Sequence, residues 1–166
     1  MSQTTWQQTW MATAQTVARR SPCEKGQVGA VIVSGTNRIV ATGFNGPPAG
    51  WEGTCERDCP RGRAWSEFQL AVSLNRDMLV IPPALSPCYD DCVTIHAEAN
   101  ALSFCDRRDR KGGTIYVSGS VCYACAKLIA NSGLARVVMS ASGYDEREGD
   151  RVVEFLRFCG LRVAIQ

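Results

Sequence analysis

The chain contains a single histidine, His96, which stands two residues before a carboxylate, Glu98. Further along, Cys122 and Cys125 are separated by two residues. One imidazole and two thiolates are suitable ligands for a tetrahedral Zn²⁺ that keeps its fourth position for water. Glu98 lies close enough to such a water to exchange protons with it without binding the metal. These four residues predict a catalytic zinc site in which Glu98 is the general acid and base.

Each part of this set has a simpler explanation when it is taken alone. A lone histidine is more often a core or surface residue than a ligand, and a lone C-x-x-C pair can be structural or redox-active. The combination is more specific, because helix-like segments carry both halves of it. We therefore favour metal chemistry over the simpler explanations.

Two predicted helices would bring the four residues together. One begins near His96 in the apolar, alanine-rich run 95–102, and the other covers residues 122–131 and stops at Gly133. If Cys122 opens its helix, both sulfurs can turn toward one point above the first turn. The partial positive charge at a helix N-terminus also favours the thiolate form that zinc requires.

The remaining hydrophobic pattern predicts a layered α/β domain in which strands and helices alternate. The predicted strands cover residues 28–33, 38–43, 114–118, 136–139 and 161–165, of which the first two form a β-hairpin. The predicted helices cover residues 6 to about 20, 66–74, 95–102, 122–131 and 150–159. After the hairpin, we expect the sheet to be mostly parallel.

The composition indicates a globular protein. With 166 residues, of which 45% are hydrophobic, the chain is long enough to bury a core, and we expect one domain over residues 1–166. A net charge of +2 is too small for dedicated binding of a nucleic acid polymer. No apolar run reaches the length of a membrane span, and the first twenty residues do not resemble a secretory leader. These features predict a cytoplasmic protein without membrane binding.

The chain has nine cysteines, and an odd number cannot close into pairs within one chain. A secreted disulfide scaffold is therefore disfavoured, and metal binding explains the cysteines better. Several of them lie in a long irregular insertion at about residues 45–92, which includes a proline-containing segment at 81–87. An insertion of this length is either functional or held by a metal.

Five sequence blocks resemble the deoxycytidylate (dCMP) deaminase family of the cytidine deaminase-like superfamily. They are residues 20–23 (RSPC), 27–33 (QVGAVIV), 43–50 (GFNGPPAG), 96–102 (HAEANAL) and 122–133. The zinc motif marks the superfamily, and the FNG loop at 44–46 narrows the resemblance to this branch. The resemblance implies a three-layer α/β/α cytidine deaminase-like fold with a central mixed sheet of about five strands. It also implies a homo-oligomer and, in many members, regulation by dCTP and dTTP.

The resemblance further implies hydrolytic deamination of dCMP to dUMP. A zinc-activated water would attack C4 of the cytosine ring, while Glu98 protonates N3 and then the leaving amine. Asn45 would hold the deoxyribose, and the backbone beside Ala97 and the 28–30 strand would frame the base. The candidates for the phosphate and sugar end are Arg20, Ser21 and Tyr144. Arg20 fits equally well as an ordinary cation at a helix C-terminus.

One position departs from the family pattern, because Val121 stands where a proline usually precedes the first cysteine of the pair. Proline presets the turn into a helix but supplies no ligand. We therefore expect coordination to survive this change, with a small shift in the geometry of the turn.

A second group of cysteines falls where bacterial proteins that resemble this chain carry a further, structural zinc. These residues are Cys23, Cys55, Cys59 and Cys92. A four-sulfur site would cross-link the insertion to the loop after the first helix and leave no position for water. Reduced thiols without metal are the alternative. Cys88 is a candidate substitute for one of the four, whereas the apolar helical contexts of Cys105 and Cys159 predict core positions.

Other functions are compatible with the zinc motif. The same chemistry could act on a nucleoside, a modified cytosine nucleotide or an RNA base, although the 44–46 loop and the modest net charge disfavour RNA. A non-catalytic, zinc-stabilised regulatory module would have no use for Glu98. The basic stretch 57–63 (RDCPRGR) could meet a phosphate of the substrate or of a regulator, or form ordinary solvated surface.

Overall fold

The computed structural model describes residues 3–74, 92–142 and 146–166. Its strands are β1 (Gly29–Val33), β2 (Ile39–Phe44), β3 (Thr114–Val117), β4 (Arg136–Met139) and β5 (Arg162–Ile165). Its helices are α1 (Trp6–Ala18), α2 (Cys55–Asp58), α3 (Pro60–Ser73), α4 (Ala97–Ser103), α5 (Arg107–Arg110), α6 (Tyr123–Asn131) and α7 (Glu146–Phe158). Within these described ranges, no helix has the length and apolar character needed to cross a membrane.

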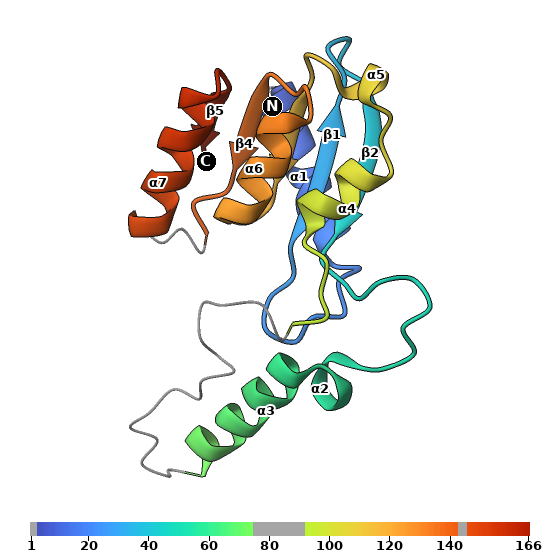
Figure 1. The fold of residues 1–166 in the computed structure, drawn as a ribbon, viewed down its shortest axis with the longest axis vertical. Helices are drawn as coiled ribbons and strands as arrows, with labels where there is room; N and C mark the ends of the chain where they lie inside the picture. Colours follow the sequence, from blue (N-terminus) through green and yellow to red (C-terminus); the bar gives the residue numbers. More distant parts are fainter. Residues whose placement is uncertain (1–2, 75–91, 143–145) are drawn as a thin grey trace.

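The five strands form one mixed sheet in the order β2-β1-β3-β4-β5 (Figure 1). β1 pairs antiparallel with both β2 and β3, whereas β3, β4 and β5 run parallel to one another. Helices α6 and α7 provide the crossovers that parallel neighbours require. The predicted five-stranded mixed sheet is confirmed, with its parallel part limited to the last three strands.

Alternate residues of each strand serve two separate cores. In β1, Ala30 and Ile32 pack into the core that α4, α6 and α7 share, while Val31 and Val33 pack into the core beneath α1. One strand can support both layers because successive side chains of a strand point to opposite faces. α1 therefore covers one face of the sheet and α4, α6 and α7 cover the other (Figure 1), which confirms the predicted α/β/α layers.

Helix α4 approaches β2 very closely at Gly43. A side-chain carbon added at Gly43 would lie 2.4 Å from the carbonyl oxygen of Ala97 and 2.4 Å from the amide nitrogen of Ala101. Ala97 and Ala101 are themselves completely buried. Small residues on both elements thus set the distance of α4 from the sheet.

One side chain of α5, Arg110, holds the C-terminal ends of α4 and α6 together. Its guanidinium donates to the carbonyl oxygens of Leu102 at 2.9 Å and Ser132 at 3.1 Å, and also to that of Cys105. Carbonyl groups at a helix C-terminus have no partner within the helix. Arg110 therefore donates hydrogen bonds to these carbonyl groups and connects the C-terminal ends of the two helices.

Three predictions about element boundaries and burial differ from the structure. α3 begins at Pro60, earlier than residue 66, because proline suits the first position of a helix. α7 begins at Glu146, four residues before the predicted start, in a polar stretch without apolar periodicity. Cys159 is exposed because it follows the end of α7, so its predicted core position is wrong, whereas Cys105 is buried as predicted. The 81–87 segment lies outside the described residues.

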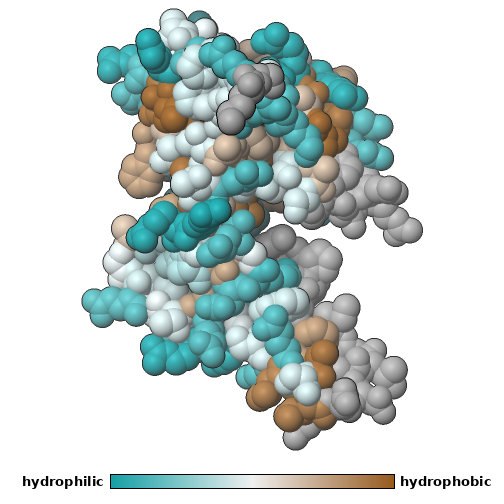
Figure 2. Space-filling model, turned by 180° about the vertical axis from the view of Figure 1, so that it is seen from behind, coloured by the Kyte–Doolittle hydropathy of each residue, from teal (hydrophilic) through white to brown (hydrophobic). Residues whose placement is uncertain are grey.

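Helices α2 and α3 lie below the layered part of the molecule in the view of Figure 1. They belong to the predicted insertion at about residues 45–92. The two helices pack tightly at Gly62, which has no side chain. A side-chain carbon there would lie 1.9 Å from the carbonyl oxygen of Cys55. Figure 2 shows apolar side chains gathered toward the far end of α3, where the exposed residues are Leu70, Val72 and Leu74.

Replacing Gly43 with alanine should destabilise the protein and displace α4. The added carbon does not fit against the backbone of Ala97 and Ala101, so we expect chemical denaturation to show a loss of about 1–3 kcal/mol in the free energy of unfolding. Gly35→Ala is the matched control, because an added carbon there would meet only the carbonyl oxygen of Gly112, at 3.9 Å. Equal stability of Gly43→Ala and the wild type would contradict the close packing of α4 on β2.

Candidate metal centre

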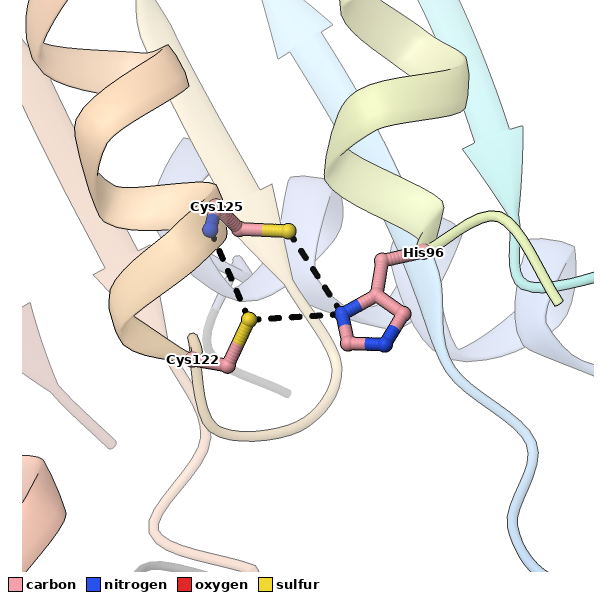
Figure 3. A group of neighbouring side chains, drawn as sticks. All are labelled: His96, Cys122 and Cys125. Atoms are coloured by element: carbon pink, nitrogen blue, oxygen red, sulfur yellow. Dashed lines mark hydrogen bonds between the residues drawn. The ribbon is translucent and has the colours of Figure 1, made fainter. Parts of the chain in front are cut away.

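Three metal-ligating side chains meet where α4 and α6 begin. His96 is the N-cap residue of α4, Cys122 is the N-cap residue of α6, and Cys125 lies in the first turn of α6. The Nδ1 atom of His96 lies 3.4 Å from the Cys122 sulfur and 3.5 Å from the Cys125 sulfur (Figure 3). In the part of the chain that the structure describes, no other group of three or more His, Cys, Asp or Glu side chains has its donor atoms within 4.8 Å of one another.

The donor set fits Zn²⁺ in both chemistry and spacing. Zinc is bound by imidazole nitrogen at about 2.0 Å and by thiolate sulfur at about 2.3 Å. Tetrahedral coordination at these lengths separates nitrogen from sulfur by about 3.5 Å, in agreement with the two observed distances. Three protein ligands leave a fourth position free, which is the arrangement of catalytic rather than structural zinc sites.

The sulfur of Cys122 is prepared to carry a negative charge. A hydrogen bond from the Cys125 thiol, supported by His96, lowers the pKa of Cys122 to about 4 although burial opposes the shift. The backbone N–H of Cys125 also donates to this sulfur at 3.4 Å. The same contacts raise the pKa of the Cys125 thiol, and hydrogen bonding to Cys122 raises the pKa of His96. The lowered pKa favours the thiolate form of Cys122, which is the form that binds zinc.

Glu98 stands beside the three metal-ligating residues without belonging to their group. It lies in the first turn of α4, is only 2% exposed, and lines the same cavity as His96 and Cys122. Burial raises the pKa of its carboxyl above the usual value. A carboxyl in such a site can alternate between holding and releasing a proton, which a general acid and base must do.

These residues face a cavity of about 370 Å³. A cavity of this size can enclose a small ligand. Other parts of its lining come from the loops before β1 and after β2, from helices α2, α3 and α7, and from the segments before α4 and α6. They include Lys25, Val28, Asn45, Arg61, Ser120 and Val121.

Val121, in place of the usual proline, is buried and faces the cavity. The next residue, Cys122, has φ −77° and ψ 162° and accepts the capping hydrogen bond of α6. The turn into the helix therefore forms without proline.

Asn45, which directly follows β2, is hydrogen-bonded to the loop before β1. Its Oδ1 atom accepts from the backbone N–H of Val28 at 2.7 Å, and its Nδ2 atom donates to the carbonyl oxygen of Gly26 at 2.8 Å. The buried hydroxyl of Ser21 donates to the carbonyl oxygen of Asn45 at 2.6 Å. The structure thus places Asn45 in the cavity wall and Ser21 behind it.

The other predicted substrate contacts lie in different surroundings. Ala97 is buried and lines the cavity beside Glu98. Arg20 is exposed just beyond the end of α1 and is not among the residues that line the cavity. This position suits the alternative role of Arg20 as a cation at a helix C-terminus. Tyr144 lies outside the described residues.

The four cysteines of the predicted second zinc site line the same cavity as two neighbouring pairs. Cys23 is hydrogen-bonded to Cys55, and Cys92 is hydrogen-bonded to Cys59. Burial raises the pKa of Cys55 to about 11. Burial opposes the shift at Cys59, but donation from backbone N–H groups, chiefly that of Val93, lowers its pKa. No three of these sulfurs lie within 4.8 Å of one another, and Cys88 lies outside the described residues.

Two cationic side chains also line the cavity. Arg61, from the basic stretch, is 4% exposed, whereas Arg57 and Arg63 of the same stretch are exposed. Lys25 is the second cation, and its Nζ atom lies over the Trp65 ring, 5.8 Å from the centroid. Burial and then repulsion from Arg61 lower the pKa of Lys25. The sequence offered no signal for Lys25 beyond a single positive charge.

Comparison with known proteins identifies relatives along most of the chain. Residues 4–141 match the family model described as the cytidine and deoxycytidylate deaminase zinc-binding region. The deoxycytidylate deaminase of Mycobacterium phage D29 is 44% identical over 138 residues, which cover 83% of this chain and 96% of that protein. Human deoxycytidylate deaminase is 32% identical over 143 residues, which cover 86% of this chain and 68% of that protein.

The fold is also shared with a solved structure. The crystal structure of dCMP deaminase from the cyanophage S-TIM5, in complex with dCMP and dUMP, is similar with a TM-score of 0.68. It has 24% sequence identity, and the similarity covers 100% of both chains. This agreement confirms the predicted cytidine deaminase-like fold. Because the family model matches most of the chain and the phage relative is 44% identical, the chain belongs to the family of deaminases that share the cytidine and deoxycytidylate deaminase zinc-binding region.

Proposed function

We propose that this protein hydrolyses dCMP to dUMP and ammonia. Its relatives from phage D29 and human are deoxycytidylate deaminases at 44% and 32% identity. The observation that carries the proposal is the buried Glu98 carboxyl beside three converging metal donors in one cavity. A purely structural zinc would need neither an open coordination position nor a buried carboxylate next to it.

The reaction follows from the residues at the centre. His96, Cys122 and Cys125 would hold Zn²⁺, which supplies a Lewis acid that lowers the pKa of a water molecule. Glu98 would accept a proton from the water while the water oxygen attacks C4 of the cytosine ring. Glu98 would then deliver that proton to N3. It then moves the proton of the new C4 hydroxyl to the exocyclic amine. Ammonia leaves, a carbonyl remains at C4, and Glu98 returns to its starting state.

The burial of Glu98 suits both proton transfers. Its pKa is raised by desolvation, so the protonated carboxyl that must donate is more readily formed than on an exposed side chain. Its position away from solvent also directs the proton to the substrate. A solvent-exposed carboxyl at the same distance from the substrate would exchange its proton with bulk water.

The remaining contacts are assigned to the cavity wall. The backbone at Ala97 and the side chain of Val28 would frame the cytosine ring, since both residues line the cavity with Glu98. Asn45 would contact the deoxyribose, since it also lines the cavity. Hydrogen bonds to Val28 and Gly26 already fix the orientation of its amide. Fixing this group before binding reduces the entropy lost in ordering it.

We further propose that a second, structural zinc binds to Cys23, Cys55, Cys59 and Cys92. All four line one cavity, and they lie in two hydrogen-bonded pairs. The lowered pKa of Cys59 favours a thiolate there. Zinc would draw the pairs together and tie α2 and α3 to the loop that follows α1.

We also propose a cellular location, an effector site and an oligomeric state. We treat residues 1–166 as one cytoplasmic deaminase domain that does not bind a nucleic acid polymer. A second cavity, of about 590 Å³ and lined in part by Trp51 and Arg57, supports binding of a nucleotide effector such as dCTP or dTTP. A homo-oligomer is supported by exposed apolar side chains, which include Phe104, Leu128 and Phe158.

An ammonia-release screen tests the substrate directly. The substrates would be dCMP, CMP, dCTP, deoxycytidine, cytosine and adenosine, each at several concentrations. We expect dCMP to give the highest kcat/KM, because the chain is similar to deoxycytidylate deaminases along most of its length. Turnover of another substrate without turnover of dCMP would contradict the proposal.

Replacing Glu98 with glutamine should abolish most of the activity while the metal stays bound. The amide cannot accept the proton of the water, so kcat for dCMP should fall about 10²- to 10⁴-fold. Zinc content should stay at the wild-type level, because Glu98 is not among the three metal donors. Glu154→Gln is the control, since Glu154 is exposed on α7. A kcat within a few-fold of wild type in Glu98→Gln would refute the assigned role.

Zinc analysis of separate cysteine variants should resolve two sites. Protein purified without chelator should contain about two zinc ions per chain. Cys125→Ser should lose one zinc together with activity, and Cys59→Ser should lose the other. Cys159→Ser should keep both, because Cys159 is exposed and is not among the residues that line the cavity. A single zinc in the wild type, lost in Cys125→Ser and kept in Cys59→Ser, would remove the structural site.

A further inference from the structure

Arg61 brings a positive charge from α3 into the cavity that contains Glu98. It is 4% exposed although it lies in a helix of the insertion. It lines the same cavity as His96 and Glu98. Arg61 therefore shares the cavity of the metal centre, although it stands 35 positions before His96 in the sequence.

The position of Arg61 is fixed by its neighbours in the chain. Cys59, two residues earlier, is 1% exposed. Gly62, the next residue, packs against α2, where a side-chain carbon would lie 1.9 Å from the Cys55 carbonyl oxygen and 2.7 Å from its sulfur. The start of α3 therefore has little freedom to move, and Arg61 is held toward the cavity.

Lys25 adds a second positive charge on the same side. It lies at the more exposed part of the cavity lining, and its Nζ atom contacts the ring of Trp65. Trp65 follows Arg61 by four residues, so both lie on one face of α3. This face of the helix is therefore turned toward the loop that carries Lys25.

The charges favour an anion in this part of the cavity. Two cations close together create a positive potential that attracts anionic groups. Among the described lining residues, the acidic side chains are Glu98, which serves in proton transfer, and Glu148, which is exposed on α7. Arginine is especially suited to phosphate, because its planar guanidinium can donate two parallel hydrogen bonds to the oxygens.

We propose that Arg61 and Lys25 bind the 5′-phosphate of the substrate and so select a nucleotide over a nucleoside. This inference rests on the proposed function and assigns a specificity role to the cysteine-bearing insertion. A substrate phosphate is favoured over a separate regulator because Arg61 shares its cavity with Glu98 and His96. The exposed Arg57 and Arg63 of the same stretch have no part in the site.

The kinetic test compares dCMP with deoxycytidine in Arg61→Gln. The ratio of the two kcat/KM values should fall about 10- to 100-fold, since a charge-assisted hydrogen bond to phosphate is lost. Arg61→Lys should retain much of the ratio because it keeps the charge. Arg63→Gln is the matched control, being exposed two residues away on the same helix, and should leave the ratio at its wild-type value.

A binding test is independent of turnover. Isothermal titration calorimetry with the zinc-loaded protein should show tighter binding of dUMP than of deoxyuridine, and Arg61→Gln should reduce this difference by the same factor. An unchanged ratio and an unchanged difference in Arg61→Gln would overturn the proposal. So would an equal loss for nucleotide and nucleoside, which is the mark of a general structural defect. Loss of dCTP binding alone would assign Arg61 to a regulator site and likewise overturn it.

The two proposals fail in distinguishable ways. If the wild type releases no ammonia from dCMP, the proposed function fails, while the comparison of dUMP with deoxyuridine still tests the phosphate site. If the wild type deaminates dCMP but binds dUMP and deoxyuridine equally, only the phosphate site fails.

Discussion

The structure depends on bringing the N-terminal ends of α4 and α6 to one point. A single ion can be shared only if an imidazole nitrogen and two sulfurs lie within narrow distance limits. The fold meets this requirement by fixing both helices away from the site. Gly43 allows α4 to settle on β2, and Arg110 ties the C-terminal ends of α4 and α6 through backbone carbonyls. The separations of 3.4 and 3.5 Å between the His96 nitrogen and the two sulfurs follow from this arrangement.

The catalytic chemistry and the proposed substrate selection come from different parts of the chain. The layered sheet and its helices supply the metal donors and the buried Glu98. The insertion supplies Arg61, and its two packed helices, α2 and α3, line the same cavity. A structural metal at the four cysteines would make this second part rigid. Because the two roles belong to different segments, substitutions in the insertion can change the substrate preference without disturbing the proton transfers at Glu98.

Local patterns made much of this predictable. The spacing of His96, Glu98, Cys122 and Cys125 pointed to the metal centre because each half lies within one helical segment. Short apolar runs located all five strands. Longer-range features were not visible. The antiparallel pairing of β1 with β3 joins distant segments, and an apolar neighbourhood did not reveal that Cys159 lies beyond its helix. Arginines 107, 108 and 110 look alike in sequence, yet only the fold shows that Arg110 holds two helices. Arg61 likewise could not be told from its exposed neighbours.

Catalysis requires that His96, Cys122 and Cys125 hold zinc next to the Glu98 carboxyl, which is not a ligand. Anomalous diffraction from crystals of the zinc-loaded protein, recorded on both sides of the zinc absorption edge, locates the metal directly. We expect a zinc peak bonded to the His96 Nδ1 atom and to the sulfurs of Cys122 and Cys125, with the Glu98 oxygens outside bonding distance. Absence of a peak between these three atoms, or a zinc bonded directly to Glu98, would contradict this arrangement.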